Sequence, residues 1–101
     1  MTTVPEIQPD PTGNYNEMHV RYALDTLELV AICWVNKIVD QKIVSLAFGN
    51  NYRNRVREIE HISIPLQPNL RKTGNELLTE RQVIRKVFNE LEKLANDQIA
   101  A

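Results

Sequence analysis

The sequence predicts an all-α fold, a small bundle of about four helices with a proline-rich extended N-terminal arm. Apolar residues recur at three- and four-residue spacing over long stretches without proline, which is the pattern of helices packed on a core. One short stretch alternates apolar and polar residues, and it has no partner strand. The 101 residues, with 43% apolar and 25% charged content, are typical of one globular domain.

The arm comprises residues 1–13, which hold three of the five prolines and one glycine. Proline removes a backbone donor and biases the preceding residue toward extended geometry, so we expect a flexible, extended arm. Within it, Val4 and Ile7 are suited to enter a groove of the body or of a neighbouring subunit. Residues 14–101 then form a single helical domain.

The first helix is expected from about Tyr15 to about Ile38, with Asn14 as its N-cap and Glu17 three residues on. Between Leu27 and Val39, ten of thirteen residues are apolar, and they lie nearly all around the helix. Such a helix must be covered on all sides by its own chain, by a second copy or by a partner. A chain this short has little else to cover it with.

A second, short helix is expected to begin after its N-cap Asp40 and to end at Gly49, a left-handed C-terminal cap. Asn50 and Asn51 then form a turn, and a third helix runs from about Tyr52 to Ile62. Residues 62–68 alternate in polarity and contain two prolines, so we expect an extended connector there.

The last helix has two candidate starts, a capping box at Thr79 with Gln82 and another at Thr73 with Glu76. Its apolar residues form one stripe. The pairs Lys86/Glu90 and Lys93/Asp97 lie four residues apart, which suits a solvated opposite face. These helices together predict a core of Leu24, Leu27, Val30, Ala31, Trp34, Ile38, Val44, Val56, Ile59, Ile84, Val87, Phe88, Leu91 and Leu94.

Composition argues against several classes of function. A net charge of −1 does not suit a protein whose whole surface binds nucleic acid or anionic lipid. The longest uninterrupted apolar run, Leu29–Val35, has seven residues, whereas a membrane span needs about twenty. No signal-peptide pattern is visible at the start of the sequence, and Cys33 is the single cysteine. We therefore expect a cytoplasmic protein that does not contact a membrane.

No catalytic, cofactor or metal site is predicted. Glu58 and His61 have the Glu-x-x-His spacing of di-iron sites in helical bundles, but those sites use the motif twice and this chain has it once. The apolar surroundings expected for Cys33 keep a thiol protonated and unreactive. The three glycines are isolated, so they build no phosphate-binding loop. We expect a protein that is not an enzyme.

The most suggestive polar feature is the basic stretch 52–57, in a part of the chain (51–86) with eight Lys/Arg against four Asp/Glu. Three arginines in five residues beside an aromatic suit phosphates or a carboxylate-rich partner. We predict a partner-binding charged patch of Tyr52, Arg53, Arg55 and Arg57. A nucleic-acid-binding module that uses the same residues is the alternative, and a solvated face partly neutralised by nearby glutamates stays open.

The apolar stretch within the first helix gives the stronger signal. We predict self-association through Leu29, Ile32 and Trp34, with a two-fold homodimer as the default geometry and a monomeric bundle as the alternative. The resulting interpretation is a small, non-enzymatic, helical protein-interaction module. It would act as an accessory or inhibitory factor by occupying a surface of a protein partner.

The segment Leu24–Gly49 combines a Leu-Glu-x-x-Ala helix (Leu27, Glu28 and Ala31), the pair Ile38-Val39, the Asp40 cap and a short helix that ends near glycine. In this combination the segment resembles a family of uncharacterised small helical proteins from bacteria and phages. The resemblance covers about a quarter of the chain. It implies a helical fold and no particular activity.

Overall fold

The computed structural model describes residues 4–100, and the surroundings of side chains as far as Asp97. The first three residues of the predicted arm and the last residue of the predicted domain lie outside this range. The described residues contain four α-helices and no strand, which confirms the all-α bundle. The helices are α1 (Glu17–Val35), α2 (Gln41–Glu60), α3 (Gly74–Thr79) and α4 (Gln82–Ala100).

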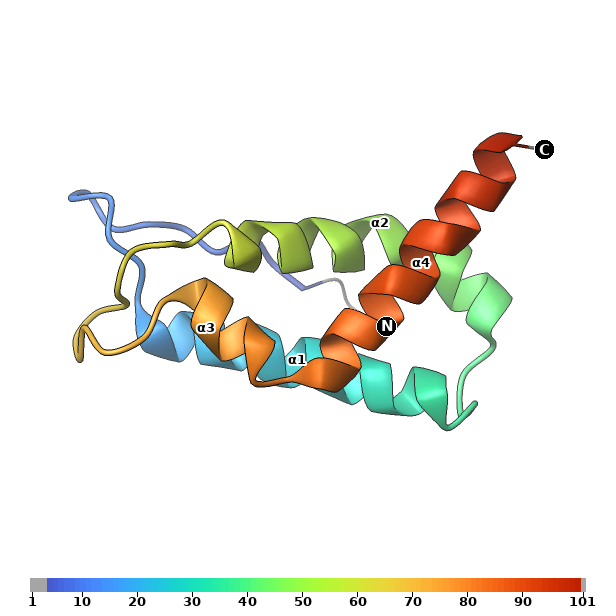
Figure 1. Ribbon diagram of the computed structural model, residues 1–101, viewed down its shortest axis with the longest axis horizontal. Coiled ribbons are helices and arrows are strands. Elements are labelled where there is room, and N and C mark those ends of the chain that lie inside the picture. The colour runs from blue at the N-terminus through green and yellow to red at the C-terminus, as the bar shows by residue number, and fades with distance from the viewer. Residues whose placement is uncertain (1–3, 101) are drawn as a thin grey trace.

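The helices α1 and α2 run antiparallel and side by side, and α4 crosses in front of both (Figure 1). The α1 helix begins two residues later than predicted, because the side chain of Asn16 is the cap and accepts a hydrogen bond from the amide of Met18 at 2.8 Å. Asp40 caps α2 as predicted and accepts from the amide of Ile43 at 3.1 Å.

The predicted break at Gly49 is wrong, because α2 is one helix of 20 residues that runs through Gly49 as far as Glu60. Among the described glycines only Gly13 has a positive φ, so Gly49 is an interior helical residue and not a left-handed cap. Continuation lets α2 bury residues on both sides of Gly49, including Phe48, Tyr52 and Val56, against the same core. This packing outweighs the low helix propensity of one glycine.

The two capping boxes considered for the last helix do not compete for one helix. Thr73 and Glu76 form the reciprocal capping box of α3, which ends at Thr79. The helix α4 begins at Gln82, and the Thr79 hydroxyl donates to the carbonyl of Asn75 instead of capping α4. Residues 62–73 form the extended connector, with isolated backbone bridges from Gln67 to Asn16 and from Pro65 to Thr73.

Most of the predicted core is buried, with three exceptions. Ile38 and Leu94 are exposed, because Ile38 follows the end of α1 and Leu94 borders open cavities beside Gln41 at the start of α2. Val30 is partly buried against the core. The prediction omitted several residues that the structure buries, namely Val4, Ile7, Val20, Ala23, Phe48, Tyr52, Ile62, Leu66, Leu77 and Leu78.

The N-terminal arm is extended and packs on the body. In Figure 1 it passes behind α2, on the side of the α1–α2 pair away from α4. The side chains of Val4 and Ile7 are buried, as the hypothesis of a groove required. The arm joins α1 through a turn in which the Asp10 carboxylate accepts from the amides of Thr12 and Asn14, both at 2.9 Å. Hydrogen bonds, chiefly from the Thr12 side chain, hold the pKa of Asp10 below its usual value.

Candidate functional site

The outer face of α1 carries four exposed apolar side chains, which we call the α1 outer face: Met18, Tyr22, Leu29 and Ile32. They are 75%, 72%, 63% and 42% exposed, respectively. Their positions fall within one stripe of a helix with 3.6 residues per turn, and the stripe is about 21 Å long. The opposite face of α1 is buried against α2, α3 and α4. The chain therefore covers one side of its most apolar helix and leaves the other open.

Charged side chains border this apolar stripe. Asp25 lies within it and is bound by Arg81 at 2.6 Å, and Arg81 also lies 3.9 Å from Glu28. Arg21 pairs with Glu17 at 3.1 Å and stays 44% exposed. Arg21 and Glu28 lie seven residues apart, two helical turns, and so share one flank of the stripe.

Trp34 is not part of this face, so the prediction that it forms a self-association contact is wrong. It is 2% exposed, and its indole N–H donates to the carboxylate of Glu90 on α4. The chain thus supplies both the cover and the hydrogen-bond partner that a buried tryptophan needs. Leu29 and Ile32, the other two predicted contacts, are exposed, and Cys33 beside them is half-buried.

The predicted charged patch does not form as an exposed group. Tyr52 is 1% exposed, and its hydroxyl donates to the carbonyl of Leu27 at 3.0 Å. Burial, and secondarily the nearby charge of Glu28, raises the pKa of Tyr52 well above its usual range. Arg55 is also buried, so neither residue is exposed as the predicted patch requires. They lie on faces of α2 that the core and the arm cover.

The other two arginines of the patch are paired. Arg53 and Arg57 both contact the carboxylate of Glu92 on α4, and Arg57 lies over the ring of Phe88. Arg85 lies over the same ring and 3.3 Å from Glu60. Helix packing therefore brings carboxylates to the basic stretch and neutralises it. This geometry does not favour the nucleic-acid-binding alternative, which needs free guanidinium groups.

A polar stripe on α2 holds the arm, and we call it the arm cradle: Asn51, Arg55 and Glu58. The Asn51 side chain accepts from the backbone amide of Val4 at 2.9 Å and donates to its carbonyl at 3.1 Å. The carboxylate of Glu58 accepts from the amide of Ile7 at 2.6 Å. Their spacing of four and three residues places all three on one side of α2. The arm cradle cannot be predicted from the sequence, because no single-residue signal marks contact with a distant extended segment.

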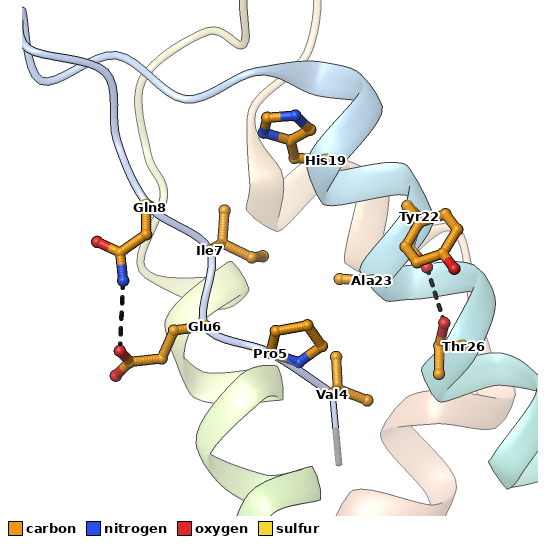
Figure 2. A pocket seen from close by; sticks show the side chains of 9 residues that line it. All are labelled: Val4, Pro5, Glu6, Ile7, Gln8, His19, Tyr22, Ala23 and Thr26. Carbon is orange, nitrogen blue, oxygen red and sulfur yellow. Dashed lines mark hydrogen bonds between the residues drawn. The ribbon is translucent and has the colours of Figure 1, made fainter. Parts of the chain in front are cut away.

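A cavity of about 350 Å³ lies between the arm and α1 (Figure 2). Figure 2 shows Val4, Pro5 and Ile7 turned toward α1, whereas the side chain of Glu6 points away from it. Ala23 and the aromatic ring of Tyr22 belong to the opposite wall. The arm therefore fills only part of the groove between α1 and α2.

The described part of the chain offers neither a metal site nor a membrane-spanning helix. It holds no group of three or more histidine, cysteine, aspartate or glutamate residues arranged to bind a metal ion. None of its helices combines the length and apolar character needed to cross a bilayer.

Comparison with known proteins finds no matching family model, no matching curated protein and no matching solved structure. The similarity of Leu24–Gly49 to small bacterial and phage proteins stays an expectation from the sequence.

Proposed function

We propose that this protein is a small, non-enzymatic interaction module that forms a two-fold dimer through the α1 outer face. As a dimer it acts as an accessory or inhibitory factor for a protein partner. The observation that carries the proposal is the group of four large apolar side chains exposed along one face of α1. An exposed apolar stripe of this kind is typical of association sites. The single cysteine, without a disulfide partner, suits a reducing compartment such as the cytoplasm.

A second copy of the chain fits the α1 outer face in an antiparallel arrangement. With the two-fold axis beside Asp25, Met18 of one copy lies opposite Ile32 of the second copy, and Tyr22 lies opposite Leu29. Large apolar residues then meet at both ends of the stripe, as an isologous interface requires. Arg81 binds Asp25 within each copy and offsets the repulsion between the two Asp25 carboxylates at the axis.

The flanks of the stripe are also complementary in this arrangement. The two-fold axis is perpendicular to the two helices. It places the same flank of each helix side by side, with the two chains running in opposite directions. Arg21 of one copy then approaches Glu28 of the second copy, and the same pair forms again on the other side of the axis. Opposite charges meet at both places, so the electrostatics favour this register.

Light scattering across a dilution series tests the proposal directly. We expect the mass of a dimer at high concentration and dissociation on dilution. Leu29→Asp removes an apolar contact on each side of the axis, so the dissociation constant should rise at least about a hundredfold.

Ile43→Asp is the matched control, because Ile43 is as exposed as Leu29, at 63%, and also lies on a helix. It belongs to a second exposed apolar group near the start of α2, with Ile38 and Leu46. We expect Ile43→Asp to leave the dimer intact. A wild-type chain that is monomeric at every concentration, or a dimer lost in Ile43→Asp and kept in Leu29→Asp, contradicts the proposal.

A further inference from the structure

Residues 4–7 lie in the groove between α1 and α2 in the manner of a bound peptide. The segment Val-Pro-Glu-Ile is extended, and its two aliphatic side chains, Val4 and Ile7, are buried in the core cluster. Side chains of α2, not backbone strands, receive the polar groups of the segment. A receptor for an extended peptide has these same two parts, pockets for particular side chains and hydrogen bonds to the main chain.

The arm cradle recognises both the backbone and the charge of the segment. Asn51 binds the amide and the carbonyl of Val4 at once, and Glu58 binds the amide of Ile7. Arg55 has a side chain that is 9% exposed, and its guanidinium lies 4.0 Å from the carboxylate of Glu6 and 2.8 Å from that of Glu58. A buried arginine beside the third position of the segment selects for an acidic residue there.

The arm leaves part of the groove empty and one buried polar atom of the groove without a hydrogen bond. The cavity of about 350 Å³ beside Pro5 is unfilled by the arm. The Nε of Arg55 is buried without a hydrogen-bond partner among the described residues, which is costly for a charged group. Glu6, the carboxylate of the arm closest to this side chain, is 68% exposed and reaches only to 4.0 Å. A better ligand would fill the cavity and bring its carboxylate closer to Arg55.

We propose that the groove is a recognition site for an extended segment of a partner protein and that the arm is its intramolecular competitor. The partner segment has aliphatic residues at its first and fourth positions and an acidic residue at its third. Its second position, which corresponds to Pro5, is a bulky apolar residue. This site is distinct from dimerisation through Leu29 and Ile32, because α2 supplies the polar side chains that bind the segment. Tyr22 borders both sites, since it belongs to the α1 outer face and to the wall of the cavity.

The arm raises the affinity that a partner segment needs in order to occupy the groove. A tethered ligand acts at a high effective concentration, in the millimolar range for short linkers, so a weak external peptide does not displace it. The apparent affinity of a partner is reduced by the fraction of molecules in which the groove is free. A segment that fills the cavity and pairs with Arg55 overcomes this competition.

Fluorescence anisotropy with two labelled hexapeptides tests the proposal on the full-length chain. One peptide, Thr-Val-Pro-Glu-Ile-Gln, carries the sequence of the arm, and the other has phenylalanine in place of proline. The double variant Val4→Asp/Ile7→Asp frees the groove by placing charges at the two buried positions. We expect saturable binding of both peptides to this variant, with the phenylalanine peptide about tenfold tighter because it buries more apolar surface. Binding to the wild-type chain should be at least about tenfold weaker, because the arm competes.

Asn51→Ala, added to the double variant, should abolish peptide binding, because it removes two hydrogen bonds to the first position. Asn54→Ala is the matched control, because Asn54 is an exposed residue on the same helix. Leu29→Asp should also leave peptide binding unchanged, which separates this site from the proposed dimer interface. Equal binding to the Asn51 and Asn54 variants overturns the proposal, as does the absence of binding to a folded double variant. Tighter binding of the proline peptide contradicts the proposed partner and indicates exchange of arms between copies.

A second measurement tests the proposal without the double variant, in case that variant does not fold. Hydrogen exchange on the wild-type chain follows the amides of Val4 and Ile7, which are bonded to the arm cradle. Excess phenylalanine peptide should displace the arm and accelerate their exchange by at least about tenfold. Exchange that does not change at the highest peptide concentration overturns the proposal.

Discussion

Two large aromatic side chains, Trp34 and Tyr52, are buried here with their polar atoms bonded. The indole N–H of Trp34 donates to Glu90, and the hydroxyl of Tyr52 donates to the carbonyl of Leu27. Each bond joins two different helices, α1 to α4 for Trp34 and α2 to α1 for Tyr52. A buried donor without a partner destabilises a fold, so these bonds help to select the observed packing from others that bury the same rings.

Tyr52→Phe removes one buried hydrogen bond and leaves the ring in place. We expect the free energy of unfolding at neutral pH to fall by about 1 kcal/mol. The substitution should also change the alkaline limb of the stability profile. Because burial raises the pKa of Tyr52 in the folded state, the unfolded chain loses this proton first. Wild-type stability therefore falls as the pH rises above about 10, the usual tyrosine value, and this loss should be smaller in Tyr52→Phe.

Urea unfolding at neutral pH and again above pH 10 measures both effects. An equal loss of stability in the two proteins between these conditions would show that Tyr52 does not control the alkaline limb.

Gly74 is held in close contact with two residues. A Cβ at this position would lie 2.7 Å from the carbonyl oxygen of Ile59 and 2.8 Å from the Cβ of Ile62. The backbone at the end of α2 cannot move away cheaply, so Gly74→Ala should destabilise the protein by about 1–3 kcal/mol. Thermal unfolding provides the measurement. An unchanged midpoint would mean that α3 can shift without loss.

At the scale of elements, the α2 helix shows how a glycine can belong to a helix interior. A Cβ at Gly49 would lie 3.5 Å from Leu91 on α4, which is ordinary van der Waals contact. The position thus has the space and the backbone conformation for alanine.

Gly49→Ala should therefore stabilise the protein by about 0.5–1 kcal/mol, because alanine has the higher helix propensity and restricts the unfolded chain. If Gly49 were a left-handed cap, the substitution would destabilise the protein, since alanine is strained in that conformation. Thermal unfolding of the wild type, Gly49→Ala and Gly74→Ala in one experiment compares their midpoints directly. A destabilised Gly49→Ala protein would contradict a continuous α2.

At the scale of the whole molecule, the three additional segments are distributed unevenly around the α1–α2 pair. The helices α3 and α4 pack on one side, and the arm lies on the other (Figure 1). The α1 outer face stays open between them. The proposed dimer forms through the α1 outer face, and the proposed peptide site includes the cavity beside the arm.

Charge exchange tests the register of the proposed dimer. Arg21→Glu and Glu28→Arg each place like charges opposite one another on both sides of the two-fold axis. Each variant should weaken the dimer by about two- to tenfold, as expected for exposed pairs. The double variant restores opposite charges and should recover most of the affinity. Sedimentation at several concentrations and at low salt gives the dissociation constants. Additive weakening in the double variant would exclude the antiparallel register.

The amino-acid sequence is enough to predict the helical class, the extended arm and most of the residues that face the core. It is enough because apolar spacing and capping act locally, and Asp40 and Thr73 cap helices as their motifs predict. It also identified Leu29 and Ile32 as apolar residues outside the buried stripe, and both are exposed.

Which of the candidate surfaces are exposed depends on how the helices pack. Whether Gly49 ends or continues a helix depends on what later turns of α2 bury, and local propensity does not contain that information. Trp34, Tyr52 and Arg55 look available in the sequence, but Glu90, Leu27 and the arm lie against them in the fold. These partners are 25 to 56 residues away for the two aromatic side chains. The exposure of a side chain depends on such distant contacts, which arise only when the helices pack.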